Sequence, residues 1–133
     1  MKKKSSTDIR LGTLEMKVMQ VVWDLGKAAV WDVKDVLGKG RKPAYTTILT
    51  TMRTLETKGY LKHVKKAAMY IYSPVLTREQ ARQGLLSDMV ERLFDGSSML
   101  LVNCLVEKKP ANNKEMKELR QIRTLMRGKK KSG

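Results

Sequence analysis

Apolar residues recur at helical spacing in three segments of the N-terminal half of the chain. The first follows Thr13, a residue type that caps helix N-termini, and stops at Gly26, a residue type that ends helices. The third starts at Pro43, which fits a first helical turn because its missing N–H would have no partner there. The predicted helices cover roughly residues 14–25, 31–37 and 43–58, and Gly59 ends the last of them.

The period changes to two after Gly59, where the runs LKHV and MYIYSPV predict two short strands. Residues 65–68 form the predicted turn, and because the turn lacks Gly and Asn its type is left open. Three helices followed by a two-stranded ribbon are the plan of a winged helix, a variant of the helix-turn-helix. In that motif the second helix of the pair, here the third helix of the chain, enters the major groove of DNA.

The third predicted helix, AYTTILTTMRTLETKGYL, carries six threonines although threonine is a poor helix former. Tyr45 and the aliphatic residues gather on one face, and most of the threonines fall on the opposite face beside Arg53. A purely solvated face would more usually carry Glu, Lys and Gln, so we expect this face to contact a partner. Threonine can read a base through its hydroxyl or its methyl group, and the first turns of the helix reach furthest into the groove. The candidate base-reading residues are Thr46, Thr47, Thr50 and Arg53, of which Arg53 can instead hold a phosphate.

Three further helices are predicted beyond Pro74. Thr77 and Gln80 form a capping-box pattern, residues 97–106 are apolar on nearly every side, and Asn113 caps the last helix. Three such helices in about 50 residues cannot bury their apolar faces alone. They either fold back on the N-terminal domain or, as we favour, pair with a second copy of the chain in a two-fold dimer. The candidate dimerisation residues are Leu85, Met89, Leu93, Leu100, Leu101, Met116, Leu119 and Ile122.

The chain is strongly basic, with 28 Lys and Arg against 13 Asp and Glu and a formal charge of +15. This excess favours a polyanionic partner, nucleic acid before an anionic membrane surface, although solubility alone can also explain it. Part of the charge lies in the tails 1–7 and 128–133, which we expect to be disordered. The loop before the third helix and the wing carry the candidate phosphate-binding residues Arg41, Lys42, Lys62, Lys65 and Lys66.

Catalytic and metal chemistry is not expected. His63 is the only histidine and Cys104 the only cysteine, so the sequence predicts no catalytic pair, no internal disulfide and no Cys-based zinc site. His63 is interpreted as a strand residue, Cys104 as a small buried residue, and Trp23 and Trp31 as packing residues. No cofactor, secretory signal or membrane span is predicted, and a reducing cytoplasm fits the single cysteine.

The chain resembles the BlaI/MecI/CopY family of bacterial transcriptional repressors, also called penicillinase repressors, over residues 11 to about 126. The resemblance rests on the segments LGTLEMKVMQVVWDLG, AYTTILTTMRTLETKGYL, MYIYSP and NNKEMKELRQI. It implies a winged-helix domain followed by a helical dimerisation domain, and a homodimer that binds a palindromic operator and blocks transcription. The predicted fold is therefore mostly α with a small β-hairpin, with a winged helix-turn-helix domain at 8–74 and a C-terminal helical dimerisation domain at 75–127.

The chain departs from the family pattern at two points. Copper-responsive members carry paired Cys-x-Cys motifs, whereas this chain has Cys104 alone, so metal sensing is not expected. Penicillinase repressors are cut at an Asn–Phe bond, in some cases under the control of a membrane sensor-protease. The equivalent bond here joins Cys104 and Leu105, with Asn103 one residue earlier, so these three residues form the candidate cleavage region and cleavage itself stays open.

An alternative function from another class is a winged-helix adaptor that contacts proteins and does not read DNA. Such a surface would more typically expose aromatic residues than threonines surrounded by Lys and Arg.

Overall fold

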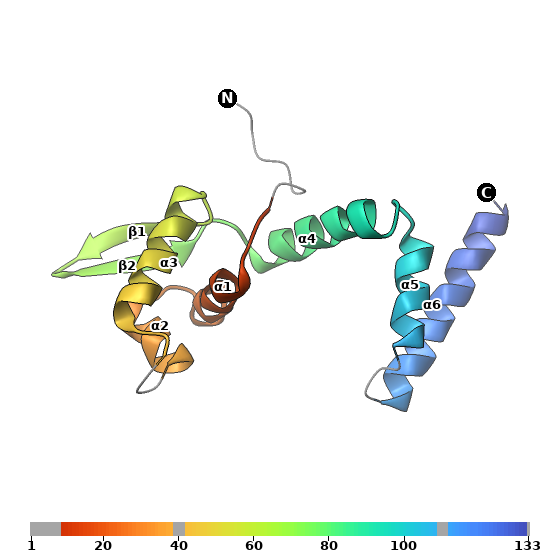
Figure 1. The fold of residues 1–133 in the computed structure, drawn as a ribbon, viewed down its shortest axis with the longest axis horizontal. Coiled ribbons are helices and arrows are strands. Elements are labelled where there is room, and N and C mark those ends of the chain that lie inside the picture. Colours follow the sequence, from red (N-terminus) through yellow and green to blue (C-terminus); the bar gives the residue numbers. More distant parts are fainter. Residues whose placement is uncertain (1–8, 39–41, 109–111, 133) are drawn as a thin grey trace, which may run out of the picture. The chain divides into compact units, whose positions relative to one another are not determined.

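The computed structural model describes residues 9–38, 42–108 and 112–132. Figure 1 shows three helices, a two-stranded hairpin and three further helices in chain order. The predicted fold class, mostly helical with a small β-hairpin, is confirmed. The chain divides into two compact units whose boundary lies between Leu85 and Leu86.

The first unit contains α1 (Thr13–Leu25), α2 (Val30–Leu37), α3 (Tyr45–Thr57), β1 (Leu61–Lys66) and β2 (Met69–Pro74). The two strands are antiparallel, and because Lys66 pairs with Met69 the turn consists of only Ala67 and Ala68. The main chain of Ala28 forms two hydrogen bonds of 2.8 Å with that of Tyr72, which holds the segment before α2 against β2. This ribbon is the wing that the change of period predicts.

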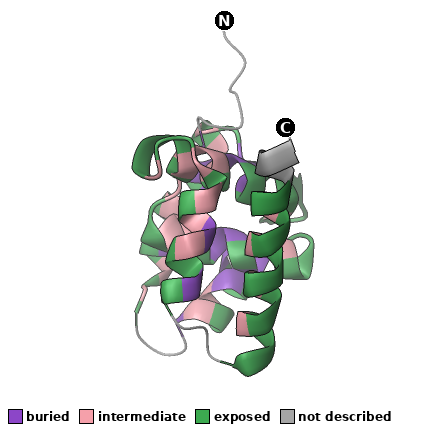
Figure 2. Ribbon diagram, turned by 90° about the vertical axis from the view of Figure 1, so that its right-hand side faces the viewer, coloured by how far each residue is buried: buried purple, intermediate pink, exposed green. Residues whose placement is uncertain are grey.

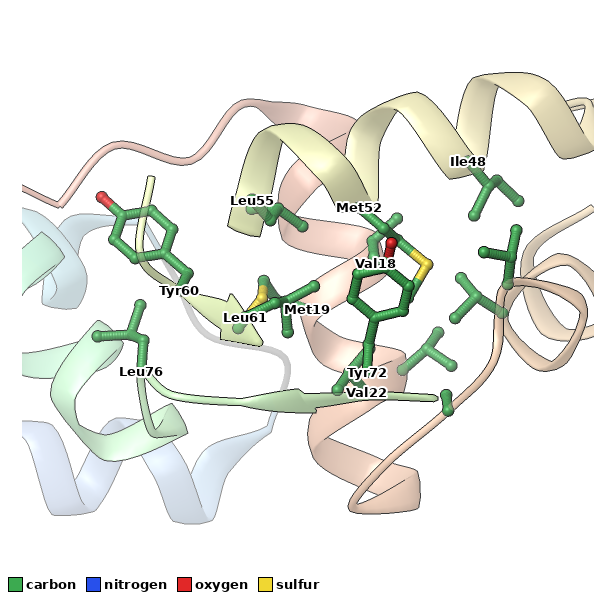
Figure 3. Packing of buried hydrophobic residues seen from close by; sticks show 14 of the residues in the cluster. Val18, Met19, Val22, Ile48, Met52, Leu55, Tyr60, Leu61, Tyr72 and Leu76 are labelled. Carbon is green, nitrogen blue, oxygen red and sulfur yellow. The ribbon is translucent and has the colours of Figure 1, made fainter. Parts of the chain in front are cut away.

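The core of the first unit lies between α1, α3 and the inner side of the ribbon (Figure 3). Each of the three helices buries the apolar side chains that recur at helical spacing in its sequence. Full burial of one such side chain stabilises the folded state by roughly 1.5–3 kcal/mol. Its fully buried large side chains are Val18, Met19 and Val22 of α1, Val33 of α2, Ile48, Met52 and Leu55 of α3, and Leu61 and Tyr72 of the strands.

Two predicted helix caps are wrong by one residue. Thr13 is the first residue of α1, and the N-cap is Gly12, whose N–H donates to Oε1 of Glu15 at 2.8 Å. The last helix, α6 (Asn113–Ser132), is capped by Asn112, whose Oδ1 accepts a hydrogen bond of 2.7 Å from the third helical amide. At α6 the capping side chain thus acts from one residue earlier than predicted, whereas at α1 the Glu15 side chain, and not that of Thr13, provides the cap.

The predicted helix ends and the capping box are confirmed. Gly26 and Gly59 follow α1 and α3 with φ of 86° and 89°, a conformation that favours glycine. At the start of α4 (Arg78–Leu93), Thr77 Oγ1 accepts from the Gln80 N–H at 3.0 Å, and Gln80 Oε1 accepts from the Thr77 N–H at 2.9 Å. These reciprocal bonds satisfy two helix N–H donors that would otherwise lack partners.

The second unit begins within α4 and continues with α5 (Ser98–Glu107) and α6. The Oγ of Ser97 caps α5 by accepting a hydrogen bond of 3.1 Å from the Leu100 N–H. α5 packs against α6, and Val102 and Val106 are the buried residues of α5. Figure 2 shows that α6, the helix ending at the C-terminus, is exposed along most of its length.

Candidate nucleic-acid interface

The two faces of α3 differ sharply in burial. Ile48, Met52 and Leu55 are fully buried, whereas the opposite side is exposed over the full length of the helix. Thr51, at the border between the two, satisfies its hydroxyl by donating to the carbonyl oxygen of Thr47 at 2.8 Å. The structure therefore brings the predicted base-reading residues together on one exposed surface, formed by Thr46, Thr47, Thr50 and Arg53.

The segment that leads into α3 differs from the prediction. Pro43 lies outside the helix, because the N-cap is Ala44 and the first helical residue is Tyr45. Ala44 offers no side-chain acceptor to the first helical amides. Of the two predicted phosphate-binding residues in this loop, Lys42 is exposed and Arg41 lies outside the described residues.

The wing carries its basic residues on exposed positions. Lys62, Lys65 and Lys66 all lie on β1 and are exposed. The turn that joins the strands places Ala67 at φ 56°, a left-handed conformation that alanine adopts only rarely. Lys65 and Lys66 therefore lie next to the tip of the ribbon, whereas Lys62 lies near its base, opposite Ser73.

A side-chain hydrogen bond joins the wing to α3. Nδ1 of His63 on β1 lies 2.8 Å from Oε1 of Glu56 on α3. The imidazole also contacts the rings of Tyr70 and Tyr72, with centroids 4.8 Å and 5.3 Å away. His63 is a strand residue as predicted, but its contact with Glu56 is a tertiary one that the sequence pattern did not reveal.

Arg53 lies beside the hydroxyl group of Tyr72. Burial raises the pKa of Tyr72 above its ordinary value of 10.0, and the Glu56 carboxylate raises it further, whereas the neighbouring Arg53 acts in the opposite direction. The Tyr72 hydroxyl thus stays protonated at neutral pH and can interact with the Arg53 guanidinium as a neutral partner.

The two tryptophans behave differently. Trp23 is a packing residue as predicted: its Nε1–H donates to the Leu76 carbonyl oxygen at 2.9 Å, and the Arg78 guanidinium lies 5.4 Å from its ring centroid. Trp31 also packs at a helix contact as predicted, but it remains 57% exposed. It lies at the start of α2 and contacts the ring of Tyr45 at a centroid distance of 4.7 Å, which covers one side of the indole only.

The predicted dimerisation residues occupy two environments. Leu85 packs against the core of the first unit. Met89, Leu93, Leu100 and Ile122 are exposed in the single chain, and so is Leu125, which the sequence analysis did not single out. The remaining predicted residues, Leu101, Met116 and Leu119, are half-buried.

The candidate cleavage region lies inside α5. Asn103 is half-buried, and its Oδ1 accepts a hydrogen bond of 3.5 Å from the Arg123 guanidinium of α6. Cys104 and Leu105 are exposed, so the prediction that Cys104 is buried is wrong for the single chain. Cys104 falls on the side of α5 that faces away from the buried residues Val102 and Val106.

No metal-binding group of three or more His, Cys, Asp or Glu residues occurs among the described residues. Within the same ranges, no helix has both the length and the apolar content needed to cross a membrane.

Comparison with known proteins gives a match along almost the whole chain. The sequence model of the family described as Penicillinase repressor matches residues 11–124. The chain belongs to the penicillinase repressor family. The match extends across both structural units, and the family comprises transcriptional repressors and not enzymes, which confirms the prediction of a non-enzymatic, DNA-binding repressor in general terms.

Individual penicillinase repressors and related regulators align over most of the chain. The penicillinase repressor of Staphylococcus aureus is 23% identical over 118 residues, which are 89% of this chain and 94% of that protein. The penicillinase repressor of Bacillus licheniformis is 25% identical over 113 residues, 85% of this chain and 88% of that protein. The transcriptional regulator BlaI of Mycobacterium tuberculosis (strain ATCC 25618 / H37Rv) is 31% identical over 90 residues, 67% of this chain and 65% of that protein.

Proposed function

We propose that the protein is a homodimeric repressor whose α3 helices read the two halves of a palindromic operator. The observation that carries this proposal is the exposed threonine face of α3, which lies over a fully buried opposite face and beside exposed lysines. Thr46, Thr47 and Thr50 would contact base edges, since short hydroxyl-bearing side chains let the helix backbone lie deep in the major groove. Lys42 and the wing lysines would fix the register by holding phosphates.

The homodimer is supported by the apolar side chains that one copy leaves uncovered. In the second unit, Leu93 and Leu125 are 70% and 71% exposed, although leucine is rarely left so open on several neighbouring helices. In a two-fold dimer both copies use the same surface, so the exposed leucines of one copy would be buried against those of the other. Two-fold symmetry in the protein would be mirrored by a palindromic operator.

Release from the operator by cleavage near Asn103, Cys104 and Leu105 belongs to the same proposal. A protease, linked to a sensor, needs an extended substrate, and these residues lie inside a helix, so α5 would have to unfold locally before the bond is cut. We propose that the repressor acts in the cytoplasm and that cleavage weakens DNA binding by removing the dimer.

A protein–protein adaptor is the second candidate function, and one observation favours it. Trp31 and Tyr70 are exposed at the edge of α3, and exposed aromatic residues are typical of protein interfaces. The aromatics nevertheless lie beside threonines, lysines and an arginine, a combination that suits nucleic acid better.

Selection from a pool of randomised duplexes by the purified full-length protein tests the proposal. The expected result is an enriched site with dyad symmetry, whose half-sites lie about one helical turn apart or a little more. Enrichment of a single asymmetric half-site would contradict the homodimer, and a pool that stays random at moderate salt would contradict sequence reading altogether.

A further inference from the structure

A hollow of about 370 Å³ lies between α3 and the wing. Its lining includes Tyr45, Leu49 and Arg53 of α3, Met69 and Tyr70 of β2, and Trp31 of α2. It is distinct from the exposed threonine face but borders it through Arg53, which lines the hollow and belongs to that face.

The lining of this hollow is unusual for the chain. The sequence contains two Trp, four Tyr and one Phe, and three of these seven rings, those of Trp31, Tyr45 and Tyr70, line the same hollow. Trp31 and Tyr70 are both exposed, and Met69 beside them is exposed as well. Aromatic surface left in water next to a cation indicates a partner that offers both an apolar face and a negative charge.

The position of the hollow identifies that partner, given the proposed function on which this inference rests. If α3 lies in the major groove and the wing lies at the adjacent minor groove, one strand of the duplex must pass between them, because a single sugar–phosphate backbone separates the two grooves. The gap between α3 and β2 is the hollow itself. A deoxyribose is apolar on its faces and each phosphate carries one negative charge, which matches the aromatic rings and Arg53.

We propose that this hollow holds the sugar–phosphate backbone that separates the two grooves, with the Trp31 and Tyr70 rings packed on deoxyribose and Arg53 paired with the adjoining phosphate. Arg53 lines the hollow, and its side chain is held beside the Tyr72 hydroxyl. The hydrogen bond between His63 and the Glu56 carboxylate fixes the wing to α3, so the width of the gap is set before DNA arrives. Trp31 and Tyr70 are therefore affinity determinants that carry no base information, unlike the threonines.

The test compares the variants Trp31→Ala and Tyr70→Ala with Leu25→Ala, which removes an equally exposed apolar side chain from the end of α1. Each full-length protein is titrated with two probes, the operator obtained by selection and a short duplex of scrambled sequence. Both hollow variants should bind both duplexes roughly three- to tenfold more weakly, so that the ratio of the two affinities stays constant. Leu25→Ala should bind as the parent does.

Footprinting supplies the second readout. Hydroxyl-radical cleavage reports access to deoxyribose, whereas methylation of guanine N7 reports contacts in the major groove. Trp31→Ala should lose sugar protection at the strand between the two grooves and keep its guanine protection.

Wild-type affinity of both hollow variants for the two duplexes, or a loss confined to the operator, would overturn the inference and leave the repressor proposal intact. If the unmodified protein binds DNA without sequence preference, the repressor proposal is overturned. The affinities of the two variants for the scrambled duplex would then still test whether the hollow contacts the DNA backbone. Thermal unfolding of each variant checks that a weaker interaction does not reflect a lost fold.

Discussion

The ammonium nitrogen of Lys58, directly after α3, lies 2.7 Å from Oε1 of Glu15 in α1. The same carboxylate accepts the Gly12 N–H that caps α1, and Lys58 also donates to the carbonyl oxygen of Arg10 at 3.2 Å. One carboxylate thus ties the start of α1 to the end of α3. Burial of Glu15 raises its pKa, but the hydrogen bonds from Lys58 and Gly12 outweigh that effect, so the net pKa lies below the ordinary value of 4.5.

Glu15→Gln should lower the free energy of unfolding by about 1 kcal/mol at neutral pH, since the amide keeps the cap but loses the ion pair. A carboxylate whose pKa is depressed in the folded state stabilises the fold above its unfolded pKa of 4.5 and loses this contribution as the pH falls through the lower folded value. Denaturant unfolding of parent and variant should therefore give a difference at neutral pH that disappears in acid.

Glu118→Gln is the matched control, because Glu118 is an exposed glutamate of α6 and its removal should not change the unfolding of the first unit. A difference between parent and Glu15→Gln that is the same at every pH would mean that the ion pair does not stabilise the fold.

Thr46→Ala and Thr50→Ala should each weaken operator binding by roughly 1–3 kcal/mol, because each removes a hydroxyl and a methyl group from the reading face. Both side chains are exposed in the free protein, so the melting temperature should stay at its parental value. Affinity for a scrambled duplex should change little, which separates base reading from backbone contacts. Thr124→Ala on α6 is the control and should bind the operator as the unmodified protein does. If both α3 variants also bind the operator with unchanged affinity, this face of α3 does not contact the bases.

Much of this surface could be predicted from the sequence, because the period of the apolar positions determines which face of a helix is buried. Ile48, Met52 and Leu55 mark the inner side of α3, and the threonines must then lie outside. The two strands follow in the same way from the change to a period of two, but the predicted turn at 65–68 is wrong by two residues, because Lys65 and Lys66 still belong to β1. Helix ends are less well determined: Gly12 caps α1 through a Glu15 side chain that any scan for Ser, Thr, Asp or Asn passes over.

The hollow beside α3 could not be predicted, because it depends on which distant residues approach each other. Trp31 and Tyr45 belong to different helices, and Tyr70 lies on the second strand of the hairpin. One signal was nevertheless present: Val30 and Val33 are the buried residues of α2, and Trp31 lies off the stripe that they define. The exposure of Cys104 was missed for a related reason. An apolar helix indicates that its side chains become buried, but the sequence does not show whether they are buried within one chain or against a second copy.

Binding should depend steeply on salt, with a slope of about 0.9 in log affinity per log salt for each phosphate that is neutralised. Lys65→Gln combined with Lys66→Gln removes two exposed cations from the wing and should lower the slope and the affinity for operator and scrambled duplex alike. The measurement is a fluorescence-anisotropy titration at several salt concentrations. The control is Lys114→Gln combined with Lys117→Gln, which removes two exposed cations of α6 and should leave the slope unchanged. If the wing variant keeps the slope of the unmodified protein, the wing lysines do not contact phosphates.

Leu93→Glu combined with Leu125→Glu should convert the proposed dimer into monomers. Both side chains are largely exposed in one chain, so glutamate meets water in the monomer but would be buried without a partner in the dimer, at a penalty of several kcal/mol. Sedimentation equilibrium should show the mass of one chain, and operator affinity should fall because two half-sites are no longer bound together. Far-ultraviolet circular dichroism should keep its helical signal, which separates dissociation from unfolding.

Val75→Glu provides the control for the dimer test. Val75 is an exposed apolar residue of the first unit, in the segment between β2 and α4, so the substitution adds a charge outside the second unit and should leave the dimer intact. A double leucine variant that stays dimeric would show that these helices meet through another face. A parent that is already monomeric at the concentration of the binding assay would instead remove the reason for a palindromic operator, since a single reading helix recognises a single half-site.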